Sequence, residues 1–189
     1  GKSPVFVDKN INIKEVARNL IWAKFVNMGQ TCIAPDYLLV DKSIEKDFDN
    51  AIQEEIQNAF GENPRESNDL ARIINQKQYD RLISYLEELE NSNTELVVKG
   101  EHDRSNLFIH PTVIKNLPLD AKIMQDEIFG PILPILYYTD VQEALDIVAE
   151  KEKPLSLYIF SHKKEYIDHV MKNSTAGGTT INDAMIHKI

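Results

Sequence analysis

The sequence is short of several features, and each shortage excludes a class of protein. One cysteine among 189 residues leaves no disulfide within the chain. The 7 glycines and 8 prolines are too few for a collagen-like or low-complexity chain. A hydrophobic content of 42% argues against intrinsic disorder. No apolar run approaches the ~18 to 20 residues that a membrane-spanning helix needs, so no membrane segment is expected.

Basic residues are also scarce. The 21 Lys and Arg stand against 30 Asp and Glu, which gives a formal net charge of -9. The densest basic stretch is Lys163-Lys164, and Glu165 and Asp168 flank it. A surface that follows nucleic-acid phosphates needs local basic clusters, so a nucleic-acid partner is not expected. A free thiol without a secretion signal favours the reducing cytoplasm.

The arrangement of apolar residues predicts the fold class. Strand-like runs are predicted at 5–7, 37–40, 95–99, 107–114, 132–138, 155–160 and 177–182, and helices at 12–25, 43–60, 76–90, 140–148 and 162–172. Strands that alternate with helices indicate an α/β fold, a three-layer αβα sandwich with a mostly parallel sheet. Neither an internal repeat nor a flexible linker interrupts the pattern, so residues 1–189 are predicted to form one domain.

Local signals set some boundaries. Asn12, with Glu15 three residues later, forms a predicted capping box. Ser43 is predicted to cap the next helix, and Gly61 to end it. Pro111 costs its strand a ladder hydrogen bond, which predicts an edge or bulged position.

Cys32 is the first candidate for chemistry. A lone cysteine is often a small buried hydrophobe. Here, however, Gly29, Gln30 and Thr31 precede it and Pro35 follows, which places the thiol in a loop. A free thiol is only a few per cent thiolate at neutral pH, so a nucleophile here needs a nearby base, cation or helix N-terminus.

The histidines add no clear site. They lie at positions 102, 110, 162, 169 and 187, and none has the spacing of a metal ligand, so no metal is expected. A Cys–His hydrolase is possible by count, because Cys32 could meet any histidine in space, but no local signature supports it. Solvated or structural histidines are the simpler interpretation.

A second unusual segment is Glu127-Ile128-Phe129-Gly130-Pro131. One interpretation is a turn with Phe129 packed in the core. The other is that a carboxylate and an aromatic ring, held on a rigid turn, accept hydroxyl hydrogen bonds and pack against a ring, as a nucleotide's sugar requires. Neither a dinucleotide-binding glycine fingerprint nor a P-loop occurs in the chain.

Taken together, these segments resemble a known family. Asn27-Met28-Gly29-Gln30-Thr31-Cys32 is similar to the N-x-G-Q-x-C motif of the aldehyde dehydrogenase superfamily, and residues 127–131 resemble its E-I-F-G-P motif. Further stretches resemble the class 3, fatty-aldehyde-dehydrogenase-like branch: Cys32-Ile33-Ala34-Pro35-Asp36-Tyr37, Ala71-Arg72-Ile73-Ile74-Asn75, Lys153-Pro154-Leu155-Ser156-Leu157-Tyr158 and Gly177-Gly178-Thr179-Thr180-Ile181-Asn182-Asp183. The resemblance covers nearly the whole chain.

The resemblance implies roles for these residues. Cys32 would be the nucleophile, and its backbone N–H one oxyanion donor. Its thiolate would attack an aldehyde, the thiohemiacetal would pass a hydride to NAD or NADP, and water would release the acid from the thioester. Glu127 would bind the nicotinamide ribose, with Phe129 packed near it. Asn27, Gly29 and Gln30 would shape the active-site loop.

The resemblance also implies that this is one domain of a longer enzyme. The water-activating glutamate of the family's E-L-G-G-K motif would stand three residues before Gly1. A second oxyanion donor belongs to the nucleotide-binding domain, and an oligomerisation segment normally follows. The expected partners are thus an aldehyde, the chain's own nucleotide-binding domain and, at full length, a second copy in a homodimer. The isolated domain is expected to be inactive.

Two other hypotheses about the function remain open. An acylating relative would pass the thioester to coenzyme A or phosphate instead of water. Alternatively, the chain could be a binding module in which Cys32 is an idle thiol. A glutamate just upstream of Gly1 would favour hydrolysis, and ordinary thiol reactivity at Cys32 would favour the module.

Overall fold

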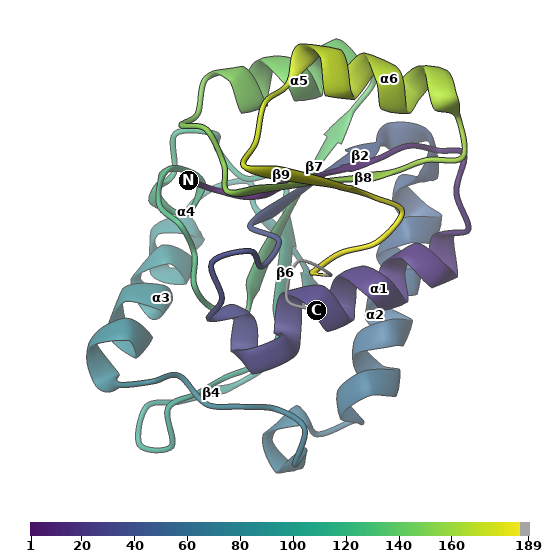
Figure 1. Cartoon of the computed structure of the whole chain (residues 1–189). Coiled ribbons are helices and arrows are strands. Elements are labelled where there is room, and N and C mark those ends of the chain that lie inside the picture. The colour runs from purple at the N-terminus through teal and green to yellow at the C-terminus, as the bar shows by residue number, and fades with distance from the viewer. Residues whose placement is uncertain (186–189) are drawn as a thin grey trace.

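The computed structural model describes residues 1–185, and a seven-stranded sheet forms its centre (Figure 1). In spatial order the strands are β3 (Glu95–Val98), β6 (Thr112–Lys115), β7 (Ile132–Tyr138), β2 (Tyr37–Asp41), β1 (Pro4–Val7), β8 (Ser156–Phe160) and β9 (Gly178–Ile181). All neighbours are parallel except β3, which runs antiparallel to β6. The predicted α/β class and mostly parallel sheet are confirmed.

Helices cover both faces of this sheet. α1 (Ile13–Phe25) and α2 (Glu45–Phe60) pack on one face, and α5 (Val141–Ala149) and α6 (Lys164–Asn173) lie on the other (Figure 1). α3 (Gln76–Leu89) and the short α4 (Lys122–Gln125) share the core of α5 and α6. In β1, Val5 and Val7 face α1 and α2 while Phe6 faces the opposite core. This burial on both faces is typical of interior parallel strands.

The cap predictions have mixed outcomes. The Asn12 side chain accepts a hydrogen bond from the Glu15 backbone N–H at 3.4 Å, and Gly61 ends α2 with φ +76°. Ser43, however, does not cap α2, so that prediction is wrong. Asp41 caps a 3₁₀ turn at Lys42–Ile44, and the Ser43 hydroxyl donates to the Asp41 carboxylate at 2.6 Å. Because that hydroxyl is engaged, α2 begins only at Glu45.

The run at 107–114 also differs from its prediction. It forms two strands, β5 (Phe108–Ile109) and β6, with Pro111 between them. β5 pairs with β4 (His102–Asp103) in a separate two-stranded sheet, whereas β6 is an interior strand between β3 and β7. Pro111 is therefore at neither an edge nor a bulge. It lies in the break between two strands, where no ladder bond is required of its nitrogen.

The topology brings two loops to the same end of the sheet. Residues 26–36 lead into β2 and residues 126–131 lead into β7, and these two strands are parallel neighbours. Both loops therefore meet at the amino ends of their strands, whereas open α/β sheets usually bind ligands at the carboxyl ends. In residues 1–185, no helix combines the length and apolar character needed to cross a membrane.

Candidate active site

The loop after α1 reverses the chain through three left-handed residues. Asn27, Met28 and Gly29 have φ values of 51°, 56° and 71°. Asparagine tolerates this conformation and glycine adopts it freely, but it is costly for methionine. A Cβ at position 29 would stand 2.5 Å from the Gly130 carbonyl oxygen and 3.0 Å from that of Lys24. Position 29 thus requires glycine for its backbone conformation and for the close approach of the two loops.

Asn27 and Gln30 hold this loop together. The Asn27 amide donates to the Gln30 carbonyl at 3.1 Å, and the Gln30 amide donates to the Asn27 carbonyl at 3.1 Å. The Gln30 side chain also bonds the Arg72 carbonyl and the Ile74 N–H, at 3.0 and 2.9 Å. Gln30 therefore joins the loop to the segment that leads into α3.

Cys32 lies on the next turn and is exposed. The Ala34 N–H closes this turn onto the Thr31 carbonyl at 3.0 Å. Thr31 and Ile33, the residues on either side of the cysteine, are both buried. The thiol therefore projects from an anchored backbone, which does not fit a small buried hydrophobe.

In the second loop, the side chain that enters the core is Ile128. Ile128 is fully buried, while Glu127 and Phe129 are exposed. Phe129 has φ +45°, a conformation that costs of order 1–3 kcal/mol outside glycine and tends to mark functional sites. Of the two interpretations of this segment, the one with Phe129 packed in the core is wrong. The ring is presented to solvent beside the Glu127 carboxylate.

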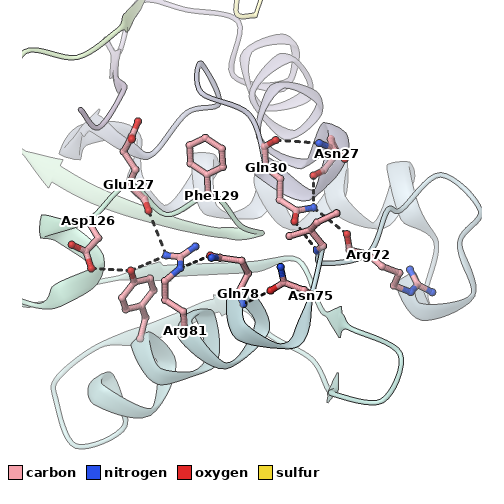
Figure 2. A pocket seen from close by; sticks show the side chains of 11 residues that line it. Asn27, Gln30, Arg72, Asn75, Gln78, Arg81, Asp126, Glu127 and Phe129 are labelled. Carbon is pink, nitrogen blue, oxygen red and sulfur yellow. Dashed lines mark hydrogen bonds between the residues drawn. The ribbon is translucent and has the colours of Figure 1, made fainter.

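A cavity of about 740 Å³ separates these loops from α3 (Figure 2). Its walls are Asn27, Gln30, Arg72, Ile74, Asn75, Gln78, Arg81, Tyr85, Asp126, Glu127 and Phe129. The structure thus brings together four of the predicted site residues, Asn27, Gln30, Glu127 and Phe129. Gly29 lies behind the wall against Gly130, and Cys32 is outside the set that lines the cavity.

Arg81 is the central cavity residue that the sequence did not reveal. Its guanidinium donates to the Ile128 carbonyl at 2.7 Å. It also reaches the Glu127 carbonyl at 3.5 Å (Figure 2). It also bonds the Gln78 side chain at 2.7 Å and the Tyr85 hydroxyl at 2.8 Å. Positions 78, 81 and 85 form a polar stripe on one face of α3, a signal visible in the sequence. Which loop that stripe faces depends on tertiary packing.

Buried charges support both loops from behind. The Asp36 carboxylate accepts from the Ile128 N–H at 2.8 Å, and the Lys2 ammonium lies 3.6 Å from it. Lys2 also donates to the Ile123 and Asp126 carbonyls, and burial lowers its pKa although Asp36 opposes that shift. Lys24, which donates to the Pro35 carbonyl at 2.9 Å, has its pKa lowered to about 8 by burial. Asp36 thus connects the cysteine segment with the glutamate loop.

The described histidines form no catalytic pair with the Cys32 thiol. Among the four histidines within residues 1–185, none hydrogen-bonds the Cys32 sulfur, and His187 lies outside the described residues. The described residues also contain no cluster of three or more histidine, cysteine and acidic side chains that could hold a metal ion. Nothing in this part of the chain builds a Cys–His hydrolase.

Comparison with known proteins assigns the family. The sequence model of the "Aldehyde dehydrogenase family" matches residues 1–189. The chain belongs to the aldehyde dehydrogenase family. It is 41% identical over 187 residues to "Aldehyde dehydrogenase family 3 member A2" of Macaca fascicularis and equally to "4,4'-diaponeurosporen-aldehyde dehydrogenase" of Staphylococcus aureus. Each match covers 99% of this chain. The resemblance to the class 3 branch of the family is confirmed.

Solved structures agree with this assignment. The substrate-bound state of Staphylococcus aureus AldH matches all of this chain with a TM-score of 0.94 and 40% identity. The NAD-dependent aldehyde dehydrogenase of Sinorhizobium meliloti matches 98% of it with a TM-score of 0.87 and 27% identity. This aldehyde dehydrogenase chain spans only 38% and 40% of the lengths of the two curated relatives.

Proposed function

We propose that residues 1–189 form the thiol-bearing catalytic domain of an NAD(P)-dependent aldehyde dehydrogenase that oxidises an aldehyde to a carboxylic acid. The observation that carries the proposal is the placement of Cys32. Its exposed thiol follows directly on the loop whose Asn27 and Gln30 line the cavity, in a chain 41% identical to class 3 relatives.

In this proposal Cys32 performs the covalent chemistry. Its thiolate attacks the aldehyde carbon and forms a C–S bond, while the carbonyl electron pair moves to oxygen. The Cys32 backbone N–H stabilises the resulting oxyanion. When the C=O bond reforms, the carbon loses a hydride and becomes a thioester, which water converts to the acid and free thiol.

The cavity residues fit a nicotinamide nucleotide. When bound there, NAD or NADP supplies the two-electron acceptor. The Glu127 carboxylate accepts hydrogen bonds from ribose hydroxyls, and the exposed Phe129 ring packs beside it. A volume of about 740 Å³ lies within the range of small-molecule and cofactor sites. Arg81 holds the backbone of residues 127–128 and so fixes where the carboxylate stands.

Three wider parts of the proposal concern the full-length protein. A nucleotide-binding domain of the same protein completes the cofactor site. The full-length protein forms a homodimer; the name of a 35% identical relative from Rattus norvegicus, "Aldehyde dehydrogenase, dimeric NADP-preferring", calls that enzyme dimeric. The free thiol of Cys32 suits the cytoplasm.

The test compares the full-length protein that carries this chain with its Cys32→Ala variant. With an aldehyde and NAD(P)+, the parent forms reduced nicotinamide and the free acid. The variant loses turnover by roughly 10³-fold or more, because no other group can form the thioester. Product analysis with and without coenzyme A separates hydrolysis from acylation. Undiminished turnover in the variant overturns the proposal.

A further inference from the structure

Tyr158 of β8 is a buried tyrosine whose hydroxyl reaches the cysteine turn. Its side chain is fully buried in the core between the sheet and helices α1 and α2. The hydroxyl donates a hydrogen bond to the Ile33 carbonyl oxygen at 2.6 Å, in a buried environment. Ile33 is the residue directly after Cys32.

This bond acts on one particular peptide group. The carbonyl of Ile33 and the N–H of Ala34 belong to the same peptide unit. Tyr158 holds its oxygen, and the Thr31 carbonyl holds its N–H at 3.0 Å. With both ends of this unit bonded, the plane of the peptide is fixed. Cys32 and Ile33 are the two central residues of the turn that the Ala34 N–H closes onto the Thr31 carbonyl, so anchoring this peptide constrains the backbone that carries the Cys32 side chain.

Burial also keeps this hydroxyl in its donating form. It raises the pKa of the Tyr158 phenol above its usual value, although Ser156 opposes that shift. The hydroxyl therefore stays protonated at neutral pH and can donate to the Ile33 carbonyl.

We propose that Tyr158 is a positioning residue for the Cys32 nucleophile, acting through the Ile33–Ala34 peptide. The inference rests on the proposed function, in which Cys32 attacks the aldehyde. Attack needs the sulfur and the carbonyl carbon in a defined geometry, and a displacement of about 1 Å can cost roughly 10²-fold in rate. Loss of the hydroxyl frees the peptide plane without removing the thiol.

The test is Tyr158→Phe in the full-length protein. We expect kcat to fall by roughly 10- to 100-fold. The KM for NAD(P)+ stays within about twofold, since Tyr158 is outside the set that lines the cavity. Iodoacetamide labelling of Cys32, followed by peptide mass spectrometry, stays within about threefold, because a small reagent requires no fixed geometry. Labelling that falls in parallel with kcat contradicts the proposal.

Tyr138 provides a matched control. It is also a buried sheet tyrosine, and its hydroxyl donates to the Val7 carbonyl at 3.1 Å. It lies at the carboxyl end of β7, opposite to the end that carries the cysteine turn. We expect Tyr138→Phe to leave kcat unchanged. Equal losses in both variants would show a general effect of the lost bond and would overturn the proposal.

Two further measurements complement the loss of kcat in Tyr158→Phe. Genetically encoded 4-aminophenylalanine at position 158 retains an N–H donor and is expected to restore most of kcat. Hydrogen exchange of the Ala34 amide is expected to accelerate at least tenfold in Tyr158→Phe but not in Tyr138→Phe. Wild-type kcat in Tyr158→Phe, or unchanged exchange, overturns the positioning role. Absence of aldehyde turnover in the parent protein is the different result that overturns the proposed function.

Discussion

Lys24 is a lysine confined to the interior behind the two loops of the candidate site. Burial lowers its pKa from 10.5 to about 8, so between these values the unfolded chain holds a proton that the folded chain has released. The free energy of unfolding therefore increases as pH rises through that window, and the cost of the charge is fully present below about pH 8. The amine still supports the backbone of the cysteine segment, through the Pro35 carbonyl.

This shift in the pKa of Lys24 predicts how the stability of the parent and of Lys24→Met should differ with pH. Between about pH 7 and pH 10, the free energy of unfolding of the parent should rise by about 2 kcal/mol relative to that of the variant. Urea unfolding at both pH values measures the difference. Parallel pH profiles for the two proteins would show that Lys24 keeps its ordinary pKa in the fold.

Glu127 is the residue on which cofactor binding depends in the proposed function. Glu127→Gln keeps the size of the side chain but removes the charge that accepts hydroxyl hydrogen bonds, each worth about 1.5–3 kcal/mol. The KM for NAD(P)+ in the full-length protein should rise about tenfold or more, while iodoacetamide labelling of Cys32 is unchanged. Glu62→Gln, at an exposed carboxylate of the loop after α2, serves as the control. An unchanged KM for NAD(P)+ in Glu127→Gln would contradict the prediction that the Glu127 carboxylate binds the ribose hydroxyls.

At the scale of the elements, substitution of Gly29 tests the contact between the loop before β2 and the loop before β7. Gly29 and Gly61 both have left-handed φ values, 71° and 76°, but a Cβ at Gly61 meets nothing within 4 Å. Gly61→Ala therefore isolates the conformational cost, about 1 kcal/mol. Gly29→Ala adds the collision with the Gly130 carbonyl and should cost about 2 to 3 kcal/mol or more.

Thermal or urea unfolding of the two glycine variants gives the comparison. Gly29→Ala should also raise the KM for NAD(P)+ in the full-length protein, because the collision displaces the loop that presents Glu127. Gly61→Ala should leave that KM unchanged. Equal losses in the free energy of unfolding would mean that the two loops can move apart to accommodate the Cβ at position 29 without a further loss of stability.

Elements whose ends are set by neighbouring residues could be predicted from the sequence. Elements whose ends depend on which of two partners a side chain binds, or on tertiary packing, could not. The helix at 12–25 is found at Ile13–Phe25 because its cap bond lies within four residues. The Ser43 cap failed because a carboxylate two residues earlier takes the same hydroxyl. The β4–β5 hairpin and α4 were missed, since their short runs carry no periodicity.

The candidate site shows the same division. Cys32, Glu127 and Phe129 could be proposed from motifs, because their residue types are unusual in their settings. Arg81 and Asp36 could not, since each acts on a backbone group far away in the sequence, at Ile128. Helical spacing is consistent with Gln78, Arg81 and Tyr85 sharing one face, but only the packing of α3 shows that this face meets the glutamate loop.

For the molecule as a whole, the strand order explains why the site exists. β2 and β7 are far apart in the sequence but are parallel neighbours, so the loops that precede them emerge together. Gly29 against Gly130 and Asp36 against Ile128 then join these loops into one wall. Cys32 and the Glu127 carboxylate are thus positioned by the sheet, while the polar side chains of α3 form the opposite wall.

These residues form only part of a catalytic site in the proposed function, which leads to a prediction for the 189-residue chain alone. The curated relatives are about two and a half times as long, since the chain spans 38–40% of the two named above. In the proposed function, the water-activating glutamate and the second oxyanion donor belong to other parts of the full-length protein. We therefore expect the isolated chain to unfold cooperatively and to react with iodoacetamide at Cys32, but not to turn over an aldehyde.

The measurement is the appearance of reduced nicotinamide when the purified chain is mixed with an aldehyde and NAD(P)+. Thioester formation needs a bound acceptor, and its hydrolysis needs an activated water, so neither step should proceed steadily. The full-length protein, assayed in parallel, is the positive control. Steady production by the 189 residues that disappears in Cys32→Ala would show instead that Cys32, Glu127 and the cavity of α3 are sufficient for catalysis.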